Sequence, residues 1–217
     1  MKRLFVFDMD DTLYPEHQFV MSGFRAVSDW AAENLGIGDF FDQALELFNN
    51  RKRKELFNNV LSHYGYVEDE MLVKRMVEVY RTHSPSISLC DDAKWALEHH
   101  RSQGPLALIT DGYLQTQRNK VAALEVAPYF DLIVYSDSLG RKNWKPSPAP
   151  YQKVMDHFNL PGSVCTYVGD NPTKDFVTAK TLGWSTVHIQ RKGGVYSDVV
   201  VDESHQANRT IYSLRDL

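Results

Sequence analysis

The sequence predicts an α/β protein with a doubly wound parallel sheet and an inserted helical segment. Two observations predict this class. From residue 85 onward, short apolar segments bounded by Asp, Gly or Ser alternate with helical patterns, as in parallel sheets covered on both faces. Residues 14–84 break the alternation, because they contain helical patterns and no convincing strand.

The strands are predicted from apolar runs that are too short to be helices. These runs are residues 4–7, 106–109, 132–135, 166–168 and 185–189. The three valines at residues 199–201 are expected to add a last, edge strand. Helices are expected around and between these strands at residues 91–101, 115–124, 150–158 and 173–182.

The inserted segment is expected to form helices at residues 20–34, 40–49, 52–64 and 68–83. Apolar side chains between Phe24 and Leu35 recur at helical spacing, which is typical of a packed interior. Pro85 ends the segment. We therefore expect a core made of residues 1–13 and 85–217, and a helical cap made of residues 14–84.

The composition is typical of a globular protein without a general affinity for nucleic acid. The 217 residues are 43% hydrophobic and 24% charged. The formal net charge of −4 gives no global basic field that would attract nucleic acid.

The cysteines and the N-terminal residues favour a reduced, cytoplasmic protein. Cys90 and Cys165 are too few for a zinc site or a disulfide framework. The apolar run after Arg3 ends at Asp8, short of the ~7–15 residues of a signal-peptide core. No stretch approaches the ~20 apolar residues of a membrane span, so we expect no membrane partner.

Carboxylates follow two of the predicted strands directly. The first strand leads into Asp8 and Asp10, whose spacing in an extended segment turns both side chains to one side. Another strand leads into Gly169 and Asp170, with Asp175 shortly afterwards. A lone Asp after a strand usually caps a helix, but acids at two strand ends indicate a shared ligand site.

The paired acids also predict a cation. Carboxylates this close repel each other unless a cation lies among them or one takes a proton. Oxygen ligands from two strand ends, with a backbone carbonyl, suit Mg²⁺, which also binds phosphate oxygens.

Two further segments offer groups for an anionic ligand. Thr110, Asp111 and Gly112 follow a third strand, where a hydroxyl and turn amides can hold phosphate oxygens, although the same tripeptide also forms ordinary turns. The ammonium of Lys145 would offset nearby carboxylates and hold a phosphoryl oxygen, whereas a loop lysine is otherwise usually solvated.

Together these segments resemble the four motifs of the haloacid dehalogenase superfamily, most of whose members are phosphatases. Residues 8–13 resemble the nucleophile motif, Thr110 the second motif and Lys145 the third. Residues 169–175 resemble the fourth motif, and the order holds over essentially the whole chain. The insertion after the first motif matches the helical cap of one subgroup.

The resemblance implies a Mg²⁺-dependent phosphatase that forms an aspartyl-phosphate. Asp8 would be the nucleophile, and Asp10 would protonate the leaving oxygen and later take a proton from water. Asp8, the backbone carbonyl of Asp10 and Asp170 would bind the Mg²⁺ ion.

The resemblance also assigns the residues that would hold the transferring phosphoryl group. Thr110 and Lys145 would hold it, while Asp175 would support Lys145 or the metal shell. The family's lysine usually lies closer to the preceding glycine than Lys145 lies to Gly140, so Lys142 is an alternative. The prolines that follow Lys145 favour Lys145.

Proteins with the same motifs can have other activities, and each activity requires different residues or gives different products. Dehalogenation needs no acid for a leaving oxygen, so Asp10 argues against it. A phosphosugar mutase with the same reacting residues is an alternative, distinguished by whether free phosphate accumulates. A non-catalytic binding protein is disfavoured, because every motif position keeps its functional group.

The cap and its hinge are expected to select the substrate. The candidate contacts are Tyr14, Glu16, His17, Phe19 and Arg25. The basic run at residues 51–54 is a candidate contact for an acidic substrate, although such runs usually form a solvated face. A small closed site favours a phosphorylated metabolite, either a sugar phosphate or a nucleoside monophosphate, over a phosphoprotein.

Overall fold

The computed structural model describes residues 3–50, 54–66 and 69–217. The chain forms two compact units, one made of Met1–Glu16 and Ser88–Leu217 and the other of His17–Ile87. Both boundaries lie slightly later than the expected ones, and at the first of them Tyr14 and Glu16 bond to core residues. The Tyr14 hydroxyl donates to Asp10, and the Glu16 N–H donates to Asp11.

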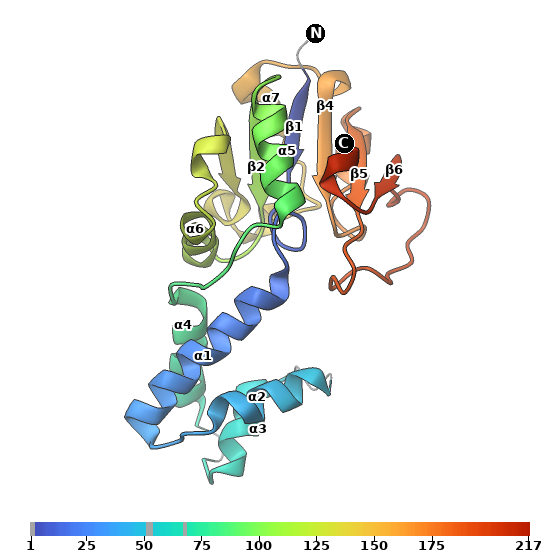
Figure 1. The fold of residues 1–217 in the computed structure, drawn as a ribbon. Helices are drawn as coiled ribbons and strands as arrows, with labels where there is room; N and C mark the ends of the chain where they lie inside the picture. The colour runs from blue at the N-terminus through green and yellow to red at the C-terminus, as the bar shows by residue number, and fades with distance from the viewer. Residues whose placement is uncertain (1–2, 51–53, 67–68) are drawn as a thin grey trace. The chain divides into compact units, whose positions relative to one another are not determined.

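The first unit contains a six-stranded sheet with the order β3-β2-β1-β4-β5-β6 (Figure 1). All five strand pairings are parallel, which confirms the predicted doubly wound sheet. The strands are β1 (Leu4–Phe7), β2 (Leu106–Thr110), β3 (Leu132–Tyr135), β4 (Cys165–Gly169), β5 (Ser185–Ile189) and β6 (Arg209–Ile211). The order reverses between β1 and β4, and this switch point is where ligands of such sheets bind.

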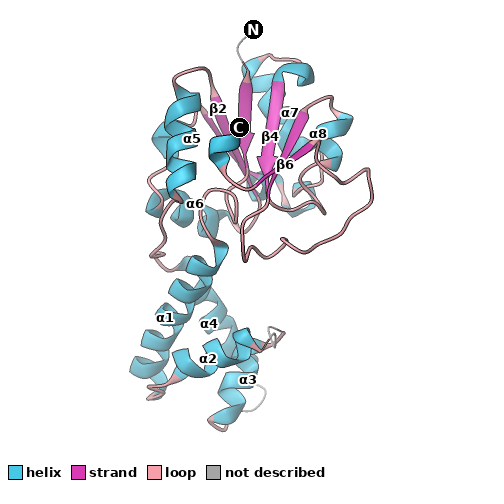
Figure 2. Ribbon diagram, turned by 45° about the vertical axis from the view of Figure 1, so that its right-hand side comes forward, coloured by secondary structure: helices cyan, strands magenta, loops and turns pink. Residues whose placement is uncertain are grey.

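Helices cover both faces of this sheet (Figure 2). They are α5 (Asp91–Arg101), α6 (Leu114–Ala123), α7 (Ala149–Phe158) and α8 (Val177–Thr181). Successive side chains of β1 point to opposite faces. Leu4 and Val6 join the apolar cluster that includes residues of α7 and α8. The Phe5 ring lies on the other face, 4.3 Å from the ring of His100 in α5.

Two predicted elements differ from the structure. Residues 199–201 form no strand, and Val200 is 94% exposed. The edge strand is instead β6, in which Ile211 pairs with Ile189 and buries its side chain. The helix expected at residues 173–182 is shortened to α8, because the preceding residues turn so that the Asn171 N–H can donate to Asp175.

The second unit is a group of four helices, α1 (Glu16–Leu35), α2 (Phe40–Asn49), α3 (Leu56–His63) and α4 (Glu70–Thr82). A common apolar cluster includes Phe24, Phe40 and Met76. Gly23 lets α1 approach α4 closely, since a Cβ atom there would lie 2.4 Å from the Tyr80 ring. Parts of the predicted helices 52–64 and 68–83, and residues 51–53 of the basic run, lie outside the described residues.

Within residues 3–50, 54–66 and 69–217, no helix combines the length and the apolar character that crossing a bilayer requires.

The buried His100 links stability to pH. Burial lowers the pKa of His100 below its ordinary value of 6.5. The unfolded chain therefore takes up a proton that the folded chain resists, and the free energy of unfolding falls as pH drops below this value. The loss is up to about 1.4 kcal/mol per pH unit for one such group. Urea denaturation above and below this pH should show a smaller loss for His100→Phe than for the wild type. Equal losses would contradict this linkage.

Candidate active site

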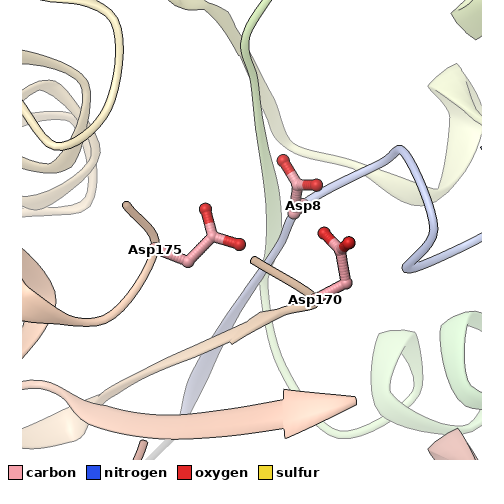
Figure 3. A group of neighbouring side chains, drawn as sticks. All are labelled: Asp8, Asp170 and Asp175. Carbon is pink, nitrogen blue, oxygen red and sulfur yellow. The ribbon is translucent and has the colours of Figure 1, made fainter. Parts of the chain in front are cut away.

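Three buried carboxylates meet beyond the ends of β1 and β4 (Figure 3). Asp8 follows β1, Asp170 follows β4, and Asp175 returns from the next turn. Each offers an oxygen atom, and these atoms lie within 4.8 Å of one another. The Asp8 N–H donates to the Val168 carbonyl at 2.8 Å, which extends the pairing of β1 with β4 to the site. The structure thus gathers acids that lie far apart in the sequence.

Lys145 supplies the ammonium group inside this cluster. Its Nζ lies 2.5 Å from Asp8 Oδ1, 2.8 Å from Asp175 Oδ1 and 2.8 Å from the Tyr167 hydroxyl. Burial acts against the charged form, but Asp175 and Asp8 raise the pKa of Lys145 well above its usual value, so the group is an ammonium ion. Lys142, the alternative considered from the sequence, is exposed to solvent.

Asp175 is held in place to face Lys145. Its Oδ2 accepts the N–H of Asn171 at 3.0 Å, while its Oδ1 contacts the ammonium of Lys145. Gly169 makes room for this carboxylate, because a Cβ atom at that position would lie 2.4 Å from Asp175 Oδ2. The glycine of the fourth motif is therefore required by packing.

The cluster contains more negative than positive charge. Burial, reinforced by Asp175, raises the pKa of Asp8 to about 7. Burial and the neighbouring Asp8 raise the pKa of Asp170 well above its ordinary value. One ammonium does not balance three buried carboxylates, and a divalent cation would remove the remaining repulsion. The residues fit Mg²⁺, which the carboxylates of Asp8 and Asp170 and the backbone carbonyl of Asp10 would hold.

Asp10 is surrounded by hydrogen-bond donors. Its Oδ1 accepts from the Tyr14 hydroxyl at 2.5 Å and from Lys120 Nζ at 2.7 Å, and its Oδ2 accepts from Gln117 Nε2 at 3.0 Å. Burial acts to raise the pKa of Asp10, but Lys120 and these hydrogen bonds lower it overall. In this arrangement Asp10 is a carboxylate.

Lys120 and Gln117 are site residues that the sequence analysis missed. Both lie on α6 and are almost fully buried. They are three residues apart, so they face the same side of the helix. No local pattern marks them, because their burial is decided by how α6 packs on the sheet.

The Thr110 segment lies at the end of β2, where Thr110 is buried and Asp111 lines the cavity. Thr110 is fully buried, and its Oγ1 accepts from Gln117 at 2.5 Å. Asp111 lines the cavity beside Asp8, where it accepts from the Lys145 N–H and from Lys174 Nζ, both at 3.2 Å. Gly112 adopts a φ of +132°, which favours glycine in this turn.

A cavity of about 140 Å³ opens beside these groups. Its described lining residues are Asp8, Asp10, Glu16, Asp111, Trp144, Asp170, Asn171, Lys174 and Tyr196. Glu16 was a candidate contact from the sequence, whereas Trp144, Lys174 and Tyr196 were not. The other candidates His17, Phe19 and Arg25 belong to the second unit.

The strand order and the acid cluster define the class of protein. A Rossmann-like sheet carries an anionic cluster around the buried Lys145 at its switch point, beyond the ends of β1 and β4. This is the position at which such sheets bind phosphorylated ligands and cations.

Known proteins that are similar in sequence or structure identify the family. The sequence model of the haloacid dehalogenase-like hydrolases matches residues 5–189. A glyceraldehyde 3-phosphate phosphatase of Methanocaldococcus jannaschii is 30% identical over 98% of this chain and 93% of its own length. A ribulose-1,5-bisphosphate 5-phosphatase of Halopiger xanaduensis is 27% identical over 84% of this chain and 82% of its own length. The Bacillus subtilis hydrolase YfnB, solved with magnesium bound, matches with a TM-score of 0.69 at 20% identity, over 99% of this chain and 96% of that chain.

The chain therefore belongs to the haloacid dehalogenase-like hydrolase family. The resemblance seen in its motifs is confirmed.

The ammonium of Lys145 should be essential for stability when no divalent cation is present. Lys145→Met leaves buried carboxylates without a partner and should lower the free energy of unfolding by about 3–5 kcal/mol. The exposed Lys142→Met is the matched control and should change it by less than about 0.5 kcal/mol. Urea denaturation measures both, and equal effects would show that Lys145 does not balance the cluster.

Proposed function

We propose that this phosphoric monoester hydrolase cleaves a small phosphorylated metabolite through an aspartyl-phosphate on Asp8, with Mg²⁺ as its cofactor. The observation that carries the proposal is Lys145 Nζ at 2.5 Å from Asp8 Oδ1, within a cluster of three buried acids. A buried lysine beside a carboxylate at a switch point suits the charge of a transferring phosphoryl group.

Sugar phosphates are the better supported of the two expected substrate classes. The relatives described above are named for a triose phosphate and a pentose bisphosphate.

The first chemical step forms a bond between an Asp8 oxygen and phosphorus while the bond from phosphorus to the leaving oxygen breaks. Lys145 would hold a phosphoryl oxygen. The Thr110 hydroxyl accepts from Gln117 and so keeps its own hydrogen for donation to another phosphoryl oxygen. Bound Mg²⁺ would offset the charge of the phosphoryl oxygens and of the two acids that hold it.

Asp10 would move the protons of both steps. In the first step it gives a proton to the leaving oxygen, and in the second it takes one from the water that attacks the aspartyl-phosphate. Because Lys120 and Tyr14 hold Asp10 as a carboxylate here, Asp10 must gain a proton before the first step. Hydrolysis then releases free phosphate and restores Asp8.

Asparagine variants should separate the two acids. Asp8→Asn should abolish the covalent intermediate, since a neutral amide is a poor nucleophile. Asp10→Asn should lower turnover of a sugar phosphate by about 10²–10⁴-fold. The loss should be smaller with nitrophenyl phosphate, whose leaving group needs little protonation. Rapid-quench trapping with labelled phosphate follows the intermediate. An acid-stable phosphoenzyme formed by Asp8→Asn would place the nucleophile elsewhere.

Mg²⁺ should stabilise the protein through Asp170. Without Mg²⁺, Asp170→Asn should be at least as stable as the wild type, because it removes a buried repulsion. The wild type should gain about 2.7 kcal/mol of unfolding free energy at 100 times the Kd for Mg²⁺, and Asp170→Asn should not.

Glu98→Gln, an exposed acid on α5, is the control and should behave as the wild type. Denaturation and calorimetry with and without Mg²⁺ measure these effects. Unchanged Mg²⁺ binding by Asp170→Asn would exclude Asp170 as a ligand.

A further inference from the structure

The cavity beside Asp8 has apolar surface that the proposed chemistry does not use. Of its described lining residues, only Trp144 and Tyr196 are aromatic, while the others carry carboxylate, carboxamide or ammonium groups. The carbon atoms of a substrate would therefore find most of their apolar contact at these two rings. Of these two residues, Trp144 directly precedes Lys145, whose ammonium contacts Asp8.

Several contacts fix the ring of Trp144. Its Nε1 donates to Asp137 Oδ1 at 3.1 Å, and Asp137 Oδ2 accepts the N–H of Leu114 at 3.0 Å, at the start of α6. The guanidinium of Arg141 lies 5.3 Å from the Trp144 ring centre and 5.1 Å from the Tyr113 ring centre. Because the indole N–H already has an acceptor, Trp144 offers carbon atoms to the cavity.

The remaining lining favours a ligand that is short and hydroxylated. The volume of about 140 Å³ suits a phosphoryl group with a short chain. Glu16 and Asn171 also line the cavity and supply groups that accept or donate hydrogen bonds to hydroxyls. A chain with carbon atoms against the indole and hydroxyls toward these residues would satisfy both kinds of surface.

We infer that Trp144 is a specificity-determining residue that packs against the carbon chain next to the phosphoester and selects short, hydroxylated phosphoesters. This inference rests on the proposed phosphatase function. It assigns substrate selection to the core unit's own loop between β3 and α7. The sequence had instead predicted that residues of the helical insertion and its hinge select the substrate.

The experiment compares substrates with and without a carbon chain. Glyceraldehyde 3-phosphate and glycerol 3-phosphate carry short hydroxylated chains, whereas phosphoramidate donates a phosphoryl group and contains no carbon. Trp144→Ala should lower kcat/KM for the two esters by about 10–200-fold, mainly through KM. With phosphoramidate the same variant should stay within about threefold of the wild type, because no carbon contact is lost.

Two further variants control for structure. Trp144→Phe keeps an aromatic ring but lacks the N–H bonded to Asp137, and it should retain most of the activity on the esters. Trp95→Ala removes a tryptophan of α5 that does not line the cavity, and it should match the wild type on all three substrates.

Each other outcome overturns a distinct claim. Equal losses of Trp144→Ala on esters and phosphoramidate would mean that Trp144 only positions Lys145. Unchanged activity on the esters would mean that Trp144 does not contact the substrate. Wild-type turnover of phosphoramidate without turnover of either ester would refute the selection of short chains. A wild type inactive on all three substrates would refute the proposed function itself.

Discussion

The burial of three carboxylates around one ammonium constrains the rest of the core. Asp8, Asp170 and Asp175 repel one another at this distance, and Lys145 offsets only part of their charge. Such a cluster is unfavourable by itself, so the surrounding structure must hold it together. The pairing of β1 with β4 and the absence of a side chain at Gly169 do so. A bound cation would offset the remaining negative charge.

The general acid–base candidate is controlled by a different part of the core. Asp10 receives its donors from α6 and from Tyr14, not from the three-acid cluster. This separation lets two carboxylates two residues apart have opposite pKa shifts, since Lys120 lowers the pKa of Asp10 overall while burial and Asp175 raise that of Asp8. Pairs of acids whose environments separate their pKa values are suited to divided roles as nucleophile and proton donor.

The acids of the proposed reaction and the aromatic residues that line the cavity come from different kinds of structure. The acids follow strands, whose ends are fixed by the ladder of the sheet. Trp144 and Tyr196 come from loops, where residues vary without disturbing the sheet. The segment between Gly140 and Lys145 is longer than in the usual family pattern, and it places both Arg141 and Trp144 beside Tyr113. One catalytic core can thus serve several substrates by changes in these loops.

The sequence by itself determined the sheet, the helical insertion and the acids at the strand ends, because short apolar runs and the residues that follow them are local patterns. It failed at residues 199–201, where β-forming valines lie in an exposed loop, since pairing with β5 decided which segment became β6. The tertiary structure alone brought Lys120 and Gln117 to Asp10. It also placed Lys145, which the prolines after it had favoured over Lys142, among the acids. These contacts join residues more than 100 positions apart, so the contacts themselves depend on how the chain packs on the sheet.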